Sequence, residues 1–142
     1  MRILLAAAAL LAVLVPGPAA GRSEAFAFFR TPSGNIGCGY GSADAGSPAF
    51  LRCDIRSGLK PKPARPRGCD LDYGDSYEMK KTGRPSVLCH GDTVFDPGAR
   101  VLAYGTSWAR DGFRCTSRTT GLRCTNSSGH GFFLSREHSQ VF

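Results

Sequence analysis

Six cysteines in a chain of 142 residues constrain this fold more than any other feature of the sequence. Their spacing includes no Cys-x-x-Cys pair and is joined by no His-x-x-x-His motif, so a zinc site does not fit them. An even set of cysteines in an exported protein indicates a disulfide framework and leaves no unpaired thiol to act as a nucleophile. The six residues are Cys38, Cys53, Cys69, Cys89, Cys115 and Cys124.

The amino-terminal segment predicts export to an oxidising compartment. Arg2 precedes an apolar run over residues 3–15, and the breakers Pro16, Gly17 and Pro18 end it. The run is shorter than the about 20 residues that a membrane-spanning helix requires. We therefore predict a signal peptide over residues 1–21, cut near Ala20 or Gly21 with a second small-residue site ending at Ala27, and one secreted domain over residues 22–142. The expected location is extracellular or in the cell envelope, with no lipid anchor and no transmembrane span.

Hairpin geometry selects the disulfide pairing. Folding residues 113–126 about their Thr-Thr turn puts Cys115 directly opposite Cys124, at the separation a disulfide needs. Cys38 and Cys53 flank a turn-rich stretch over residues 41–48 and are expected to close a second hairpin. Cys69 and Cys89 then pair by elimination. Each bridge should stabilise the folded state by about 2 to 4 kcal/mol, chiefly by restricting the conformations of the unfolded chain.

Frequent glycine and proline, with no helix-periodic stretch, predict a mostly β fold: a small disulfide-stapled single domain of short antiparallel strands and hairpins. We expect strands over residues 25–30, 36–40, 49–55, 86–89, 113–118, 122–126 and 132–136, with weaker ones at 70–72 and 76–80. Residues 90–94 predict a turn leading into a strand, residues 96–98 a tight turn, and residues 100–104 a core strand. A closing strand towards Val141 and Phe142 would hide the aromatic end in the core.

A basic, proline-rich stretch over residues 58–68 is a candidate binding element. Its three prolines prevent it from pairing as a central strand, and it carries Lys60, Lys62, Arg65 and Arg67. It is either a recognition loop preorganised by polyproline conformation or a solvated connection. The formal net charge of +7 allows attraction to anionic polymers, and we expect such binding to be weak, salt-sensitive and centred on these four residues.

Histidines and carboxylates supply the candidates for catalysis. His90, Asp92 and His130 lie in turn segments, where functional groups often gather. Ser135 could complete a Ser-His-Asp set, but no G-x-S-x-G elbow accompanies it, and a triad is defined by geometry. Asp70 and Asp72 would share one face of a strand, but exposed or arginine-paired carboxylates near a turn explain them better than a glycosidase pair does.

Several short motifs together resemble those of small secreted actinobacterial proteins grouped as a domain of unknown function. The matching residues are 31–38 (TPSGNIGC), 52–55 (RCDI), 89–94 (CHGDTV), 102–105 (LAYG), 121–126 (GLRCTN) and 129–136 (GHGFFLSR). The resemblance spans nearly all of the predicted mature chain. It implies export, three bridges and a compact domain, and it carries no catalytic residue.

The sequence therefore favours a non-catalytic secreted or envelope-associated binding module. Its expected partner is an anionic cell-wall component or a protein. We expect a monomer with no nucleic-acid partner, no cofactor and no metal. The alternatives are a small secreted hydrolase that uses His90, Asp92 and His130, and an inhibitor of a foreign enzyme. Clustering of these three residues in one cleft would favour the hydrolase, and a protruding loop would favour a binder or inhibitor.

Overall fold

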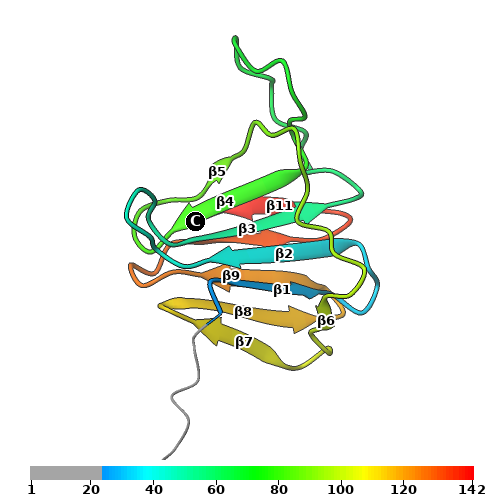
Figure 1. The fold of residues 1–142 in the computed structure, drawn as a ribbon. Coiled ribbons are helices and arrows are strands. Elements are labelled where there is room, and N and C mark those ends of the chain that lie inside the picture. Colours follow the sequence, from blue (N-terminus) through cyan, green and yellow to red (C-terminus); the bar gives the residue numbers. More distant parts are fainter. Residues whose placement is uncertain (1–23) are drawn as a thin grey trace, which may run out of the picture.

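The computed structural model describes residues 24–142, which form two β-sheets. The predicted signal peptide over residues 1–21 and its cleavage sites near Ala20 and Gly21 lie outside the described residues. The first sheet has the strand order β5-β4-β3-β2-β1-β6 and the second has the order β11-β10-β9-β8-β7 (Figure 1). The strands are Phe26–Arg30 (β1), Ile36–Gly41 (β2), Phe50–Ile55 (β3), Ser76–Lys80 (β4), Ser86–Val87 (β5), Arg100–Val101 (β6), Ser107–Arg110 (β7), Phe113–Arg118 (β8), Gly121–Thr125 (β9), Gly131–Leu134 (β10) and Ser139–Val141 (β11).

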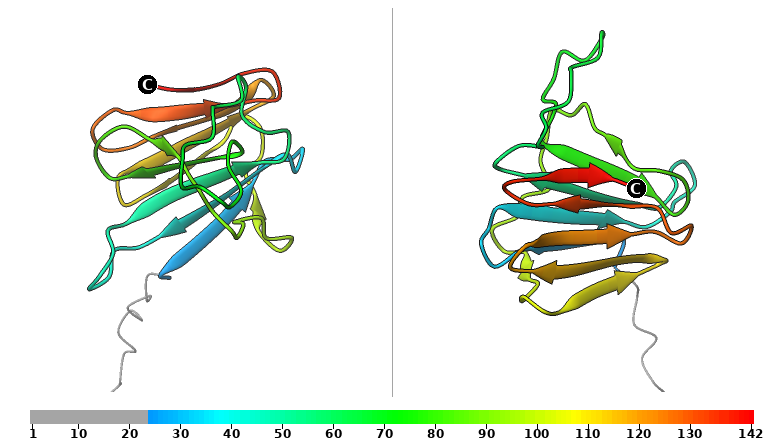
Figure 2. Two further views of the ribbon diagram at one scale, coloured as in Figure 1. Left: turned by 90° about the horizontal axis from the view of Figure 1, so that it is seen from above. Right: turned by 180° about the vertical axis from the view of Figure 1, so that it is seen from behind.

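The two sheets pack face to face as a sandwich (Figure 2). Alternation along each strand sends one set of side chains inward, as in β8, where positions 113, 115 and 117 are buried. Aromatic pairs cross the interface: the ring centroids of Tyr77 and Phe132 lie 5.6 Å apart, and those of Phe29 and Trp108 lie 5.0 Å apart. The structure thus confirms the predicted small, mostly β, disulfide-stapled domain.

All three predicted disulfides are present. Cys115 faces Cys124 in the β8–β9 pair, with 4.1 Å between their Cα atoms, and Cys38 faces Cys53 in the β2–β3 pair at the same distance. Both bridges are fully buried in the core. The third, Cys69–Cys89, joins two loop segments.

Several strand predictions need correction in the stretch between β4 and β8. Residues 100–104 are not a core strand: only β6 forms, its two residues are exposed, and it pairs in parallel with β1. Leu102 alone is buried there, and its N–H donates to the carbonyl of Arg30 at 2.8 Å. The expected strand at 86–89 is limited to β5, and residues 70–72 contribute only an isolated bridge between Asp72 and His90.

The segment expected to enter a strand after His90 instead crosses the outer face of the six-stranded sheet. It fits there because β2 presents glycines outward. A Cβ at Gly37 would come within 2.6 Å of the Phe95 ring, and one at Gly39 within 2.9 Å of a Val94 methyl. Side-chain packing and hydrogen bonds from Thr93 and Val94 to Asp54 therefore hold the segment on the face of the sheet, without strand pairing of its own.

The carboxyl end also differs from prediction. β11 closes the second sheet as expected, but Phe142 is only half-buried and lies outside the core. The Arg123 guanidinium lies over its ring, 3.8 Å from the centroid. The aromatic terminus thus packs on the outer surface of the five-stranded sheet.

Candidate functional site

The basic, proline-rich stretch forms the outer limb of a projecting loop, here called the stapled loop, which comprises residues 59–74. It rises from the sandwich as the green loop at the top of Figure 1. Its ends are closed by the N–H of Leu59, which donates to the carbonyl of Gly74 at 2.8 Å. Leu59 is buried in the core, whereas residues 60–68 are exposed apart from a half-buried Pro63.

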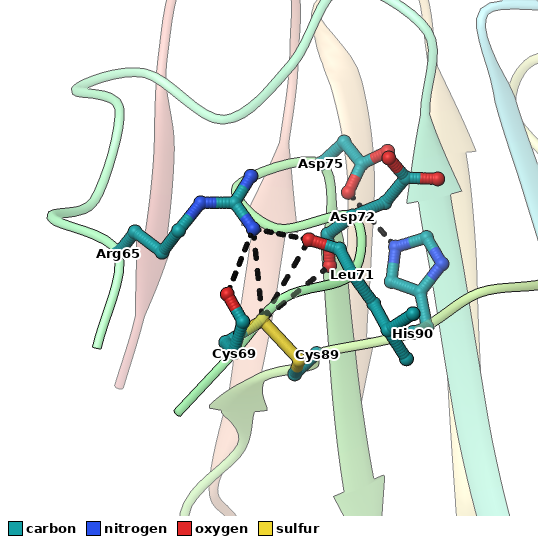
Figure 3. Close-up of a disulfide and its surroundings, with 7 residues drawn as sticks. All are labelled: Arg65, Cys69, Leu71, Asp72, Asp75, Cys89 and His90. Carbon is teal, nitrogen blue, oxygen red and sulfur yellow. Dashed lines mark hydrogen bonds and ion pairs between the residues drawn. A yellow bond between two sulfur atoms is a disulfide. The ribbon is translucent and has the colours of Figure 1, made fainter. Parts of the chain in front are cut away.

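A disulfide and a short β-bridge fix the base of the stapled loop (Figure 3). Next to the Cys69–Cys89 bridge, the backbones of Asp72 and His90 exchange two hydrogen bonds of 2.9 and 3.1 Å. Arg65 turns back over this base and donates from Nη1 to the carbonyl of Cys69 at 3.1 Å and to that of Leu71. Arg65 therefore stabilises the shape of the loop and contributes less to its exposed positive charge.

The basic outer limb of the loop is also hydrogen-bonded to β11 of the five-stranded sheet. The N–H of Lys60 donates to Ser139 Oγ at 2.5 Å, and the N–H of Ser139 donates to the Lys60 carbonyl at 2.8 Å. Three prolines then restrict the backbone dihedrals of residues 61–66. Fixed at both ends and stiff between them, the loop loses little conformational entropy when it binds a partner.

Charge is unevenly distributed along the stapled loop. Three exposed cations, Lys60, Lys62 and Arg67, take part in none of the salt bridges of residues 24–142. The second limb of the loop, residues 69–74, carries two exposed carboxylates, Asp70 and Asp72. A cleft of about 520 Å³ at the inner side of the loop is lined by both signs of charge. The loop therefore presents a basic outer limb beside an acidic base.

Sequence reasoning missed the buried charge cluster that supports this base. Arg52, on the outward side of β3, is only 5% exposed. It binds Asp54 through two hydrogen bonds of 2.8 and 3.0 Å, and its Nη1 donates to the Asp92 carboxylate at 2.6 Å. Arg52 and Asp54 flank Cys53, and this alternation could have predicted that they share the face opposite the disulfide.

His90 connects this cluster to the stapled loop. Its Nδ1 lies 2.6 Å from the carbonyl of Asp92, and its Nε2 lies 2.9 Å from the carboxylate of Asp75. Nε2 therefore donates to the Asp75 carboxylate, whereas Nδ1 lies between the Asp92 carbonyl, which only accepts, and Nη2 of Arg52 at 2.8 Å, which only donates. Burial alone would lower the pKa of His90, but these two hydrogen bonds outweigh it and raise the pKa above its usual value.

The carboxylates of the cluster are held ionised. Burial opposes ionisation of Asp54, but hydrogen bonds from Arg52 and from the N–H of Val94 bring its pKa below the usual value. The hydrogen bond from Arg52 likewise lowers the pKa of Asp92. Each of these groups has a partner within the cluster, an arrangement that stabilises a shape, although the Asp92 side chain itself is 79% exposed.

His130 does not join the cluster. It lies just before β10, and its Nδ1 is 3.2 Å from the carbonyl of Phe142. No hydrogen bond or salt bridge in residues 24–142 links it to His90 or Asp92. Ser135 is also engaged, since its Oγ donates to the carbonyl of His138 at 2.9 Å. No group of three His, Cys, Asp or Glu side chains in the described part of the chain is arranged to hold a metal ion.

Comparison with known families adds one relation. A model described as a family of unknown function, DUF6636, matches residues 9–142, which include both sheets, the stapled loop and the buried cluster. The chain belongs to the DUF6636 family. No curated protein and no solved structure matches it. Within residues 24–142 of this DUF6636 protein, no helix is long and apolar enough to cross a membrane.

Proposed function

We propose that this DUF6636 protein is a non-catalytic, secreted or envelope-associated binding module whose stapled loop contacts an acidic surface of a protein partner. The observation that carries the proposal is the loop itself, which projects from the sandwich and is fixed at its base by the Cys69–Cys89 bridge. Three buried or loop-closing disulfides are compatible with an extracellular protein.

The chemistry of the loop favours an acidic protein surface. Lys60, Lys62 and Arg67 are exposed, and the hydrophobic side chain of Leu71 is 54% exposed on the neighbouring limb. Cations around an exposed apolar side chain are typical of protein recognition, where charge steers the encounter and apolar contact contributes affinity. Rigid attachment lowers the entropic cost of that contact.

The two alternatives receive less support from the geometry. A hydrolase built from His90, Asp92 and His130 would need a free base, but His90 uses both ring nitrogens and Arg52 binds the Asp92 carboxylate. An inhibitor that mimics a protease substrate would present extended backbone. The outer limb instead ends in a turn, in which the N–H of Cys69 donates to the Pro66 carbonyl at 3.3 Å.

Site-specific photocrosslinking tests the proposal. A photoreactive residue replaces the exposed Ala64 in the loop, and the matched control replaces the exposed Ala45 in the β2–β3 connection. In the native culture, we expect a discrete protein adduct from position 64 only. The combined Lys62→Glu and Arg67→Glu substitutions should abolish it, and the partner, purified and identified by mass spectrometry, should bind the parent protein directly. Identical adducts from both positions, or none from position 64, would contradict the proposal.

A further inference from the structure

Within residues 24–142, the outer face of the five-stranded sheet is uncovered except where Phe142 packs against Arg123. Figure 2 (right) shows no segment crossing it, in contrast to the segment after His90 that covers part of the other sheet. The strand registers determine which side chains this face presents. Its outward positions are Ser107, Ala109, Arg114, Thr116, Arg118, Gly121, Arg123, Thr125, Gly131, Phe133 and Gln140.

Three of these outward residues are arginines and none is acidic. Arg114, Arg118 and Arg123 are exposed, and none of the salt bridges of residues 24–142 includes them. Glu137, in the β10–β11 turn, lines the same cleft as Arg118 but forms no salt bridge with it. On β3 and β4 of the other sheet, by contrast, the outward cations Arg52 and Lys80 each pair with a carboxylate. The cationic charge of this second face is therefore uncompensated, and we name the three arginines the arginine row.

The arginine row has a regular repeat. Arg114 and Arg118 are four residues apart on β8, and Arg123 on β9 lies opposite Thr116, midway between them. At about 3.3 Å per residue and about 4.8 Å between strands, successive arginines advance by about 7 Å along the strand and alternate between two adjacent strands. A flexible arginine side chain readily spans that lateral offset.

This repeat fits an extended phosphodiester polymer. Two residues of extended backbone contain six bonds and span about 7 Å. A polymer whose phosphorus atoms are separated by six single bonds, as in a three-carbon polyol phosphate, has the same extended repeat. Arginine is suited to each phosphate because its guanidinium binds two oxygens at once.

We propose that the arginine row binds a linear polyol phosphate, with one phosphate at each guanidinium. A single-stranded nucleic acid has a similar backbone repeat, but it is held by exposed aromatic rings on which bases stack. Here Phe133 is half-buried, and the ring of Phe142 is already covered by the Arg123 guanidinium at 3.8 Å. Thr116 and Thr125 stand beside the row with hydroxyls, which suit a hydroxylated chain. This inference does not rest on the stapled loop.

Titration with a synthetic glycerol-phosphate oligomer tests the inference. If the parent protein neutralises three phosphates, a plot of the logarithm of the binding constant against the logarithm of salt concentration should have a slope of about −2. In the Arg114→Gln, Arg118→Gln, Arg123→Gln variant we expect affinity at low salt to fall at least about tenfold and the slope to approach zero. The matched control, Lys60→Gln, Lys62→Gln, Arg67→Gln, removes three charges from the stapled loop. The sequence alone centred anionic-polymer binding on this loop, whereas the arginine row predicts that the control changes affinity less than about threefold.

Each result decides the inference. Absence of binding by the parent at low salt overturns it, and so does loss of binding in the loop variant with retention in the arginine-row variant. A single-stranded oligonucleotide with the same number of phosphates should bind more weakly than the oligomer; tighter binding assigns the face to nucleic acid and also overturns the inference. The Arg114→Gln, Arg118→Gln double variant keeps the contact between Arg123 and Phe142. A loss of affinity in this variant is therefore not caused by disruption of that contact. The crosslinking result at Ala64 is independent of all these outcomes.

Discussion

Replacing Arg52 by methionine should destabilise the protein strongly, because it leaves a buried carboxylate without its cation. Arg52 and Asp54 are 5% and 3% exposed and share two hydrogen bonds. Removing one partner of a buried pair costs about 3–5 kcal/mol. That is a large part of the about 5–15 kcal/mol that stabilises a typical domain. The N–H of Val94 and the hydroxyl of Thr93 still donate to Asp54, so the lost contribution is that of the guanidinium itself.

The pH dependence of the loss identifies its cause. In the parent the pKa of Asp54 lies below its usual value, so its contribution is present above about pH 4 and is lost as pH falls through the folded-state pKa. In Arg52→Met, burial without a cation raises the pKa of Asp54 in the folded state. The variant should therefore regain stability relative to the parent as pH falls from 7 towards about 4.

Urea denaturation with the disulfides intact, followed by the fluorescence of Trp108, measures both effects. Arg84→Met is the matched control, because Arg84 is exposed, and it should change the free energy of unfolding by less than about 0.5 kcal/mol. Adding Asp54→Asn to Arg52→Met should restore part of the loss. A loss below about 1 kcal/mol for Arg52→Met, or a pH profile parallel to that of the parent, would refute the assignment of a buried ion pair to β3.

Three further predictions address the third disulfide, His90 and Asn126. Combined Cys69→Ser and Cys89→Ser substitutions should lower the free energy of unfolding by about 3 kcal/mol, because the bridge spans a sequence separation of 20. They should also speed tryptic cleavage after Arg67, the only Lys or Arg of the stapled loop that is not followed by proline, as measured by mass spectrometry of the digest. Because the pKa of His90 is raised in the folded state, its contribution should be full below about pH 6.5 and lost as pH rises through the folded pKa, and His90→Gln should flatten that part of the stability profile measured by urea titration. Asn126→Ala should cost about 2 kcal/mol in the same assay, since the buried amide donates to two backbone carbonyls at 2.8 and 3.0 Å; a cost near zero would show that water satisfies them.

Local geometry explains which parts of the fold were predictable. The register of the β8–β9 hairpin was predicted correctly because a two-residue turn and a cysteine pair fix it together. The β7–β8 hairpin was missed although Asp111 and Gly112 are the strongest hairpin signal in the chain. Both have positive φ, 49° and 88°, as a two-residue turn of this kind requires.

Long-range packing explains the rest. Residues 92–95 are positioned by the outward glycines of β2, some 55 residues earlier, and no local pattern reveals such a contact. Likewise His90 and Asp92 were identified as candidate site residues from their turn, but their partner Arg52 lies 38 and 40 positions away. The sequence identified polar residues worth attention and could not indicate that they satisfy one another.

The charge distribution links the two proposals. On the six-stranded sheet, Arg52, Asp54, Asp92 and His90 neutralise one another, and through Asp75 the cluster reaches the base of the stapled loop. A buried cluster of this kind is a poor source of net stability. It does, however, define one position for each of its members, so the loop above it is held in a single geometry. On the five-stranded sheet none of the salt bridges of residues 24–142 includes Arg114, Arg118 or Arg123, and we propose that their charge binds an external anion. One sheet therefore uses its charges to hold a recognition loop in place, and the other presents them to a ligand.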